Sequence, residues 1–420
     1  MIFTRIRQSL APGQRLPEDL RHNFIHLLLD IGWYGVLNAT TMTFLTIYAT
    51  RIHARADQIG LISAIPALMT MLFALPAGVY LKKRSLTKSA IRLGIVHRSF
   101  YFLLVLLPFI ANQQNQVSMI LLITVIMFIP YSAFSMAFNA LFGATVPIEW
   151  RGYYAGARNA LFAIVTIIVS LLSGFLLEKL TFPLGYQIVF GMGFIGAMMS
   201  QYHIAQLRVS PEDANPKFEV WLAETKIKLT NRIKNSFRFD VLRGPFLRIL
   251  LVLTLFHFTQ YLALPLFPLF YVNELKLSDQ IISIGTAIFY VTMFIGSMQH
   301  SRIVARFGNR WAVGAGMILL AAYPAILSLA TNAGFYLAAN IVSGFAWSLS
   351  GTAMFNYLLE NIPAESRPAY LAWFSLLANF GVLSGSMLGP VIGNWIGIVP
   401  ALVLFAIFRA AAGTAILRWG

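Results

Sequence analysis

Long apolar runs separated by short polar loops make up most of the chain. A helix needs about 20 residues to cross the hydrocarbon core of a bilayer, and twelve runs approach or exceed that length. In the first half they cover residues 24–49, 58–81, 91–111, 117–144, 157–177 and 184–205; in the second half they cover 246–272, 281–298, 311–330, 333–358, 370–388 and 399–416. Since only helices and closed barrels satisfy their own backbone in lipid, the pattern predicts an all-α polytopic membrane protein with about twelve transmembrane helices.

The longest polar stretch separates the runs into two sets of six. It predicts an N-terminal six-helix bundle over residues 1–207, a cytoplasmic linker over 208–244 and a C-terminal six-helix bundle over 245–420. Within the linker, apolar residues recur at helical spacing beside lysines and arginines, from Phe218 to Phe237. Both an amphipathic helix on the membrane surface and a solvated linker fit this segment.

Two short motifs occur once in each half. The pattern P-x-E-x-R-x-x-Y begins at Pro147 and again at Pro363, 216 residues later. The tripeptide Asp-Gln-Ile begins at Asp57 and again at Asp279, 222 residues later. Because the offsets are similar and the motifs occupy equivalent loops, they favour a duplicated six-helix unit and therefore two pseudo-symmetric bundles.

Composition and charge support a membrane protein. The chain is 58% hydrophobic and 11% charged, with a mean hydropathy of +0.72, which leaves too little polar surface for a soluble protein. Its net charge of +16 would suit nucleic acid, but the basic residues gather in alternate loops, 23 on the side of the termini and four on the other. This asymmetry predicts a multi-pass protein of the cytoplasmic (inner) membrane with both termini cytoplasmic and no nucleic-acid partner.

The sequence offers little covalent or metal chemistry. It has no cysteine, which excludes disulfides and thiolate nucleophiles, and His22 and His26 lack an evident third metal ligand. A membrane-embedded enzyme acting on lipid would need acids, histidines or nucleophiles clustered at one membrane face. We therefore expect no catalytic residues, no metal and no cofactor, and we predict that the chain is not an enzyme.

With these features the chain resembles the major facilitator superfamily of secondary transporters over its whole length. The family's loop motif, Gly-x-x-x-Asp-Arg-x-Gly-Arg-Arg, is partly kept after the eighth run, where Arg306, Gly308 and Arg310 match but Ala305 stands at the Asp position. The first copy, from Gly78 to Lys88, keeps a basic run and likewise lacks the acid.

The resemblance implies that these loops form a charge latch between the bundles, which here would act through its basic half. Glu360 is a further partner on the same side. The latch candidates are Arg84, Glu149, Arg151, Arg306, Arg310, Glu365 and Arg367. The alternative is that these arginines only set membrane topology.

A Gly-Pro-rich stretch runs from Gly385 through Pro390 to Gly393, in the eleventh run rather than the fifth, where the family's antiporters carry it. It predicts close helix approach and bending, and it does not indicate antiport. Pro265 and Pro268 predict a broken end to the seventh run.

Asp30 is the one acid predicted deep within a run, with His26 four residues before it and Tyr34 and Asn38 four and eight after it. This spacing puts the four on one helical stripe. If the stripe faces water, Asp30 could carry a coupling proton and His26 could exchange it. The alternative is an acid that bonds to neighbouring helices.

The resemblance also implies that spans one, four, seven and ten line a central cavity. Their polar and aromatic residues are the candidates for solute binding, and each alternatively forms an interhelical hydrogen bond. The candidates are Tyr34, Asn38, Tyr131, Ser135, Asn139, His257, Gln260, Tyr261, Asn340, Trp347 and Ser350. Of the two arginines within runs, we expect Arg98 to snorkel to the membrane boundary and Arg409 to meet an acid or phosphate.

The sequence thus predicts a monomeric secondary active transporter that moves a small solute by alternating access, with membrane lipid around it and protons as a hypothetical coupling ion through Asp30. The scarcity of cavity charges favours a neutral, amphipathic or zwitterionic solute. Two alternatives remain: a non-transporting receptor or scaffold derived from a transporter, and a membrane-embedded lipid-modifying enzyme.

Overall fold

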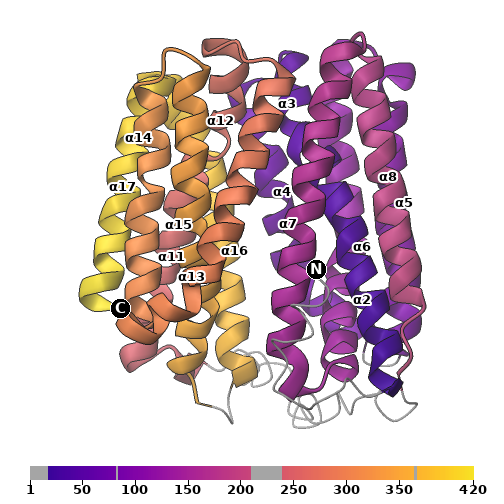
Figure 1. Ribbon diagram of the computed structural model, residues 1–420, viewed down its shortest axis with the longest axis vertical. Helices are drawn as coiled ribbons and strands as arrows, with labels where there is room; N and C mark the ends of the chain where they lie inside the picture. The colour runs from indigo at the N-terminus through magenta and orange to yellow at the C-terminus, as the bar shows by residue number, and fades with distance from the viewer. Residues whose placement is uncertain (1–17, 82–83, 210–238, 364–366) are drawn as a thin grey trace.

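The computed structural model describes residues 18–81, 84–209, 239–363 and 367–420. Over these residues the chain is helical and contains no strand. The helices form two bundles that stand side by side, one from each half of the chain (Figure 1). Residues 210–238, which the sequence predicts to form either an amphipathic helix or a solvated linker, lie outside the described residues.

The first bundle contains six spans. The first span is built from α2 (Glu18–Leu37), a π-helical segment η1 (Asn38–Met42) and α3 (Thr43–Arg51). The others are α4 (Ala56–Leu81), α5 (Leu86–Ile110), α6 (Gln113–Thr145), α7 (Ile148–Lys179) and α8 (Leu184–Ala205). We call the end of the bundles where α2 begins and α8 ends the terminal end, and the opposite end the distal end.

The second bundle repeats this plan after a short 3-10 turn, η2 (Phe239–Val241). Its seventh span consists of α11 (Gly244–Ala263), α12 (Leu266–Leu269) and η3 (Phe270–Glu274). The remaining helices are α13 (Asp279–Leu320), α14 (Ala322–Ser328), α15 (Ala333–Glu360), α16 (Arg367–Ile396) and α17 (Ile398–Trp419).

Local sequence explains several of these boundaries. Ser278 caps α13 by accepting a hydrogen bond from the Ile281 amide at 3.3 Å, and Asn332 caps α15 by accepting from the Gly334 amide at 2.8 Å. The predicted break near Pro265 is confirmed, because α11 ends at Ala263 and α12 follows.

The helix labelled α13 contains two of the predicted spans. Its backbone leaves the helical region at Gly308, where φ is +82°, a conformation that glycine adopts without steric cost. The chain reverses there, so the eighth span continues to Phe307, further than the predicted end at residue 298, and the ninth begins at Asn309.

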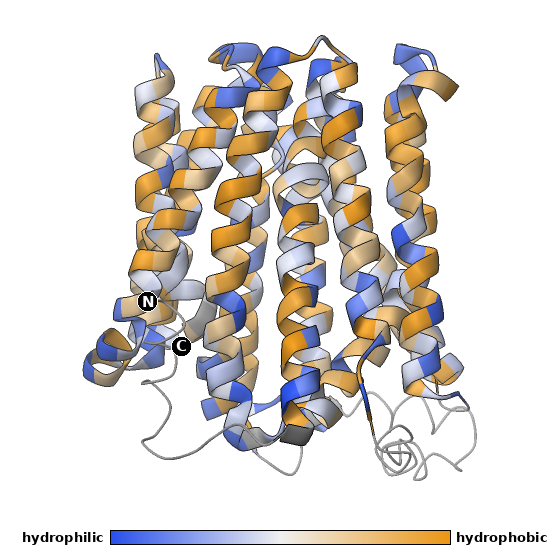
Figure 2. Cartoon of the chain, turned by 45° about the vertical axis from the view of Figure 1, so that its right-hand side comes forward, coloured by the Kyte–Doolittle hydropathy of each residue, from blue (hydrophilic) through white to orange (hydrophobic). Residues whose placement is uncertain are grey.

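Nine helices among the described residues are long and apolar enough to cross a membrane, and the one over Asp279–Ser328 includes both spans on either side of Gly308. Hydrophilic residues gather at the two ends of the helices (Figure 2). Large apolar side chains are exposed between those ends, as Val79, Ile168 and Ile407 illustrate. This distribution fits a protein whose middle zone is solvated by lipid.

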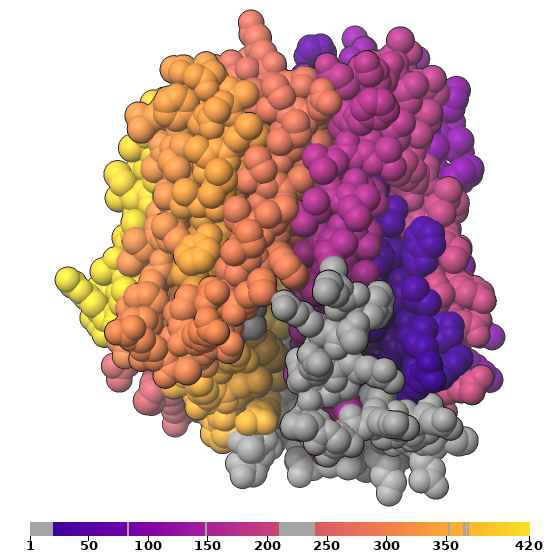
Figure 3. All heavy atoms as spheres, in the orientation of Figure 1, coloured from indigo at the N-terminus to yellow at the C-terminus, as the bar shows by residue number. Residues whose placement is uncertain are grey.

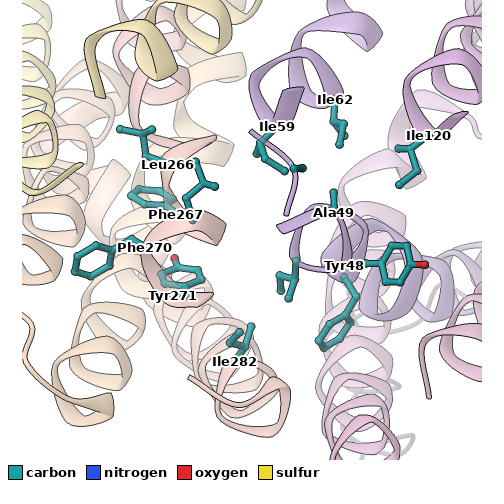
Figure 4. Packing of buried hydrophobic residues seen from close by; sticks show 14 of the residues in the cluster. Tyr48, Ala49, Ile59, Ile62, Ile120, Leu266, Phe267, Phe270, Tyr271 and Ile282 are labelled. Atoms are coloured by element: carbon teal, nitrogen blue, oxygen red, sulfur yellow. The ribbon is translucent and has the colours of Figure 1, made fainter. Parts of the chain in front are cut away.

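Among the described residues, three apolar clusters form the core, and one of them joins the bundles. At the distal end, residues such as Tyr48 and Ile59 pack in the same cluster as Leu266 and Phe270 (Figure 4). The other two clusters lie toward the terminal end, one made from the first bundle alone and one from the second alone. The two halves also touch along the upper part of the face seen in Figure 3. The bundles are therefore closed against each other at the distal end.

Two glycines allow this closure. A Cβ on Gly60 of α4 would lie 2.4 Å from the Ser386 carbonyl oxygen of α16, and one on Gly174 of α7 would lie 2.3 Å from the Ser283 hydroxyl of α13. The two contacts join span two to eleven and span five to eight, which are exchanged by the twofold relation of the halves. Both lie in the distal half of their helices, so the closure consists of two equivalent seams.

Within the second bundle, the predicted close approach of the Gly-Pro-rich helix is confirmed. Cβ atoms on Gly385 and Gly389 of α16 would lie 2.5 Å and 1.9 Å from the carbonyl oxygens of Phe258 and Leu262 on α11. The two helix backbones therefore pack directly against each other.

The seams predict that a larger side chain at Gly174 shifts the protein from the form closed at the distal end toward a form open there. A Gly174→Leu substitution adds a side chain that fits only when the distal end opens, at a cost of about 1–3 kcal/mol in the closed form. We expect a cysteine placed at Leu266, buried at the distal seam in a chain without native cysteine, to react with a maleimide about 5- to 150-fold faster.

Gly156→Leu on the same helix is the matched control, because a Cβ at Gly156 meets nothing within 4 Å. Equal labelling rates in the Gly174→Leu protein and this control would show that the seam does not hold the distal end closed.

Candidate functional site

A charged contact joins the two bundles at the distal end. The Arg51 guanidinium, at the end of α3, lies 3.0 Å from the Asp279 carboxylate at the start of α13 and also donates to the Leu277 carbonyl oxygen at 2.6 Å. The Tyr186 hydroxyl of α8 donates to the other carboxylate oxygen at 2.8 Å. Because Asp279 is 12% exposed, this pair is partly shielded from water and salt.

The repeated Asp-Gln-Ile motif therefore has different partners in its two copies. Asp57, in the first turn of α4, pairs with the nearby exposed Arg55 at 2.7 Å, whereas Asp279 pairs across the bundles. Both ion pairs among the described residues lie at the distal end, whereas the latch that the resemblance implies lies at the terminal end.

A polar and aromatic cluster lies between the bundles, below the distal closure. The Asn38 amide of η1 donates to the Tyr290 hydroxyl of α13 at 2.9 Å. The Phe162 ring of α7 packs edge-on against Tyr290, with ring centroids 5.8 Å apart, and stacks on Tyr34 of α2 at 6.1 Å. The cluster thus combines two hydrogen-bonding side chains from opposite bundles with three aromatic rings.

Asp30 lies inside the first bundle, unlike Tyr34 and Asn38 of its predicted stripe. It is 7% exposed and accepts a hydrogen bond from the Ser200 hydroxyl of α8. Ser200 in turn accepts from the Arg98 guanidinium of α5 at 2.9 Å, and Arg98 also donates to Gln201. The serine links the carboxylate to the guanidinium inside the first bundle.

The expectation that Arg98 snorkels is wrong. Arg98 is only 5% exposed, and its guanidinium lies 5.1 Å from the centre of the Phe134 ring. Burial of a guanidinium is costly without compensating groups, and the Ser200, Gln201 and Asp30 oxygens supply them.

A polar ladder continues from Asp30 along α2 and α8 to the terminal end. One turn beyond the Asp30–Ser200 contact, the Nδ1 atoms of His26 and His203 are 3.0 Å apart and share a hydrogen bond. One turn further, His22 Nε2 lies 3.0 Å from the Gln206 carbonyl oxygen. Although three histidines lie near one another here, the described residues contain no group of His, Cys, Asp or Glu arranged to hold a metal ion.

The three candidates on span four lie in different environments and do not form a common binding surface. The Tyr131 ring packs 4.9 Å from the His97 ring, within the first bundle. Ser135 donates to the Ser132 carbonyl oxygen of its own helix at 3.1 Å, and Asn139 is exposed.

On span seven, His257 Nδ1 lies 2.8 Å from the Leu253 carbonyl oxygen of its own helix. Its ring packs edge-on against Phe374 of α16, with ring centroids 5.9 Å apart. Gln260 Oε1 is buried and has no hydrogen-bond partner among the described residues. Tyr261 lies beside Gly385 of α16.

The span-ten candidates are mostly buried in helix contacts. Asn340 donates to the Tyr336 carbonyl oxygen at 2.8 Å and Ser350 donates to Ala346 at 3.2 Å, both within α15. Trp347 is half-buried and packs on the apolar cluster of the second bundle. Of all the predicted cavity residues, the structure brings Tyr34 and Asn38 to the cluster between the bundles.

Arg409 of α17 is 1% exposed and has carbonyl partners instead of the expected acid or phosphate. It donates to the Leu320 carbonyl oxygen at 3.1 Å and to the Gln260 carbonyl oxygen at 3.0 Å. Pro324, four residues after Leu320, has no amide to bond that carbonyl, which leaves it free for Arg409. Each bundle thus has a buried arginine in an equivalent place. Arg98 lies among spans one, three and six of the first bundle, and Arg409 lies among spans seven, nine and twelve of the second.

At the terminal end the loop arginines bond to helix ends within their own bundle. Arg151 donates to the Val146 and Gly143 carbonyl oxygens at 3.0 Å, and Arg310 donates to the Ile416 carbonyl oxygen at 3.1 Å. Such contacts add hydrogen bonds to the last carbonyls of a helix, where intrahelical amide partners run out. Glu360 accepts from Asn309 at 2.6 Å.

The other latch candidates have no hydrogen bond or ion pair to the opposite bundle among the described residues. Arg84 and Arg306 lie over the neighbouring rings of Tyr80 and Phe307, with their Cζ atoms 4.2 Å and 5.2 Å from the ring centroids. Glu149 and Arg367 are exposed, and Glu365 lies outside the described residues.

Sequence reasoning missed Tyr290, Phe162 and His203. Tyr290 and Phe162 lie on spans eight and five, outside the four spans that the resemblance assigns to the cavity. His203 stands three residues after Ser200, on the helical face that meets α2, and a search for antiparallel partners of the His26–Asp30 pair could have found it.

Comparison with known proteins agrees with this architecture. The family model described as Major Facilitator Superfamily matches residues 24–258 and 249–420. No curated protein matches the chain. Solved structures with the same fold include a bacterial homolog to the human lysosomal transporter Spinster in an inward-facing and unoccupied conformation, at 14% identity and a TM-score of 0.69, over 96% of this chain and 98% of that one.

Two further structures are similar over nearly their full lengths. The nucleoside transporter NupG is 12% identical with a TM-score of 0.66, over 96% of this chain and 99% of that one. A bacterial homologue of the iron transporter ferroportin in an inward-facing state is 14% identical with a TM-score of 0.67, over 97% and 99%. At these identities the likeness is one of fold.

The Asp30–Ser200–Arg98 network predicts a stability effect. Arg98→Leu removes the cation and leaves the buried carboxylate without compensation, at a cost of about 3–5 kcal/mol. We expect a clearly lower thermal unfolding midpoint for the purified protein. Arg92→Leu, on the exposed side of the same helix, should leave the midpoint unchanged, and equal midpoints for the two variants would contradict the assignment.

Proposed function

Because this chain belongs to the major facilitator superfamily, we propose that it is a secondary active transporter that carries a small solute across the membrane by alternating access. The observation that carries the proposal is the unequal joining of the bundles: one apolar cluster spans both at the distal end, whereas each bundle has its own cluster toward the terminal end. Two of the similar structures are described as inward-facing.

The proposal places the solute at the cluster of Tyr34, Asn38, Phe162 and Tyr290. These side chains come from both bundles, so a solute bound there contacts both at once. Aromatic rings and an amide suit an amphipathic solute without multiple charges. To open the distal side, Arg51 must separate from Asp279 and the seams at Gly60 and Gly174 must part.

The same proposal fixes orientation and assembly. The basic terminal loops put the terminal end in the cytoplasm, and the protein works in the cytoplasmic (inner) membrane as a monomer surrounded by lipid. Its bundles are residues 1–207 and 245–420, joined by the cytoplasmic linker 208–244. The structure then corresponds to a form that is open toward the cytoplasm.

Proton coupling through Asp30 forms part of this proposal. The ladder of His22, His26 and His203 reaches from the terminal end to within one helical turn of Asp30 and Ser200. Histidine exchanges protons near neutral pH, so the ladder supplies a route between water and the buried carboxylate. Protonation of Asp30 removes its charge beside Arg98 and so alters the packing of spans one, three and six.

Solute binding gives the first test. A thermal-shift screen of the purified protein against metabolites and drugs identifies a ligand, whose accumulation is then measured in proteoliposomes. Tyr290→Phe removes one hydrogen-bonding group, worth about 0.5–1.5 kcal/mol, so we expect Kd to rise about 2- to 12-fold. Tyr202→Phe, at a side chain 53% exposed on α8, is the control and should bind normally.

A ligand that binds but never accumulates would support a receptor or scaffold derived from a transporter, and would overturn the transport proposal. Unchanged binding in the Tyr290→Phe protein would move the solute site elsewhere without affecting the transport proposal.

Coupling gives the second test. In proteoliposomes with an imposed pH gradient, Asp30→Asn should lose gradient-driven accumulation while it retains solute exchange, because an amide cannot carry the proton. Glu178→Gln, at an exposed distal acid, should accumulate solute normally. An Asp30→Asn protein that still responds to the pH gradient would exclude Asp30 as the proton carrier.

A further inference from the structure

An apolar groove opens on the outer wall of the first bundle. It lies between α4, α5 and α6 and has a volume of about 440 Å³, within the range of about 300–1,000 Å³ of small-molecule sites. Its lining includes Phe73, Tyr80, Val96, Phe100 and Pro130 and is apolar almost throughout. Tyr80 is 39% and Val96 47% exposed, so the groove opens to the surroundings of the bundle.

Two prolines and two small residues account for the hollow. Pro76 stands inside α4 and Pro130 inside α6, where a proline bends a helix and removes one backbone hydrogen bond. Ala77 and Ala133 form part of the wall, and their short side chains leave the space between the helices unfilled.

The shape of the groove suits an acyl chain. Tyr80 and Phe73 are seven residues apart on α4, or about 10 Å along the helix at about 1.5 Å per residue. Leu93 and Phe100 bound a stretch of the same length on α5. The groove therefore extends along the helices, in the direction in which lipid chains lie beside a membrane protein.

The terminal end of the groove is positively charged. The Arg84 guanidinium lies 4.2 Å from the centre of the Tyr80 ring, which itself lines the groove. Arg84 is exposed, as are Lys88 and Arg92 near the start of α5. The sequence contains no Asp or Glu between Asp57 and Glu149, so no acid on these three helices beyond the first turn of α4 offsets this charge.

We propose that this groove is a binding site for one anionic phospholipid, with an acyl chain along the wall from Tyr80 to Phe73 and the phosphate on Arg84. The apolar wall supplies contact area for the chain, and the guanidinium selects a headgroup with net negative charge. Tyr80 joins the two parts, because its ring contacts both the groove and the cation.

The test uses native mass spectrometry of the purified full-length protein titrated with phosphatidylglycerol or with phosphatidylcholine carrying the same acyl chains. We expect a first phosphatidylglycerol to bind roughly five-fold more tightly than phosphatidylcholine, the effect of one basic residue near an anionic surface. Arg84→Ala should remove this preference and leave phosphatidylcholine binding unchanged. Val96→Trp, which fills the groove from its rim, should weaken binding of both lipids.

Two matched variants control for general effects. Arg302→Ala removes an exposed cation from the terminal end of the second bundle, and Val79→Trp adds an indole to an exposed site on α4 outside the groove lining. Neither should change lipid binding. Equal affinity of the wild-type protein for the two lipids would overturn the proposal whatever the variants do, and so would an Arg302→Ala loss as large as that of Arg84→Ala.

Discussion

The contact between Arg51 and Asp279 is the interaction on which the relative placement of the two bundles depends. It is the described ion pair that crosses between them, and it lies over the seams at which Gly60 and Gly174 bring helix backbones together. Beneath it, the apolar cluster that includes Tyr48 and Leu266 excludes water from the distal end. Charge, close packing and apolar burial therefore all act at the same end of the two bundles.

Each bundle is held together internally by a buried guanidinium. Arg98 is balanced by Ser200, Gln201 and, through the serine, Asp30, whereas Arg409 is balanced by two backbone carbonyls at helix breaks. Lipid offers these polar groups no water as a hydrogen-bond partner, so they must bond within the protein. These contacts therefore fix the packing of spans one, three and six in the first bundle and of spans seven, nine and twelve in the second. The alternating access that we propose requires such internal contacts, because each bundle must keep its own packing while the interface between the bundles changes.

The fold was predictable because helix length and loop charge follow directly from the thickness and chemistry of the bilayer. The break at Pro265 and the close approach at Gly385 were also predictable, since both depend on local residue chemistry. The hydrogen-bond partners of the polar residues within the spans were not predictable. Arg98 lies close enough to the membrane boundary to snorkel, and only its packing against α8 shows why it stays buried. Asn38 was named from its spacing, but Tyr290 lies 252 residues away on a helix that spacing alone does not bring near.

The most direct test of alternating access is a pair of spin-label distances measured by double electron-electron resonance in a chain that has no native cysteine. Labels at Gln114 and Thr331 report the distal end, and labels at Glu149 and Arg302 report the terminal end; all four sites are exposed. We predict that Asp279→Asn lengthens the distal distance and shortens the terminal one. Distances that stay unchanged, or that lengthen together at both ends, would contradict two bundles that open alternately.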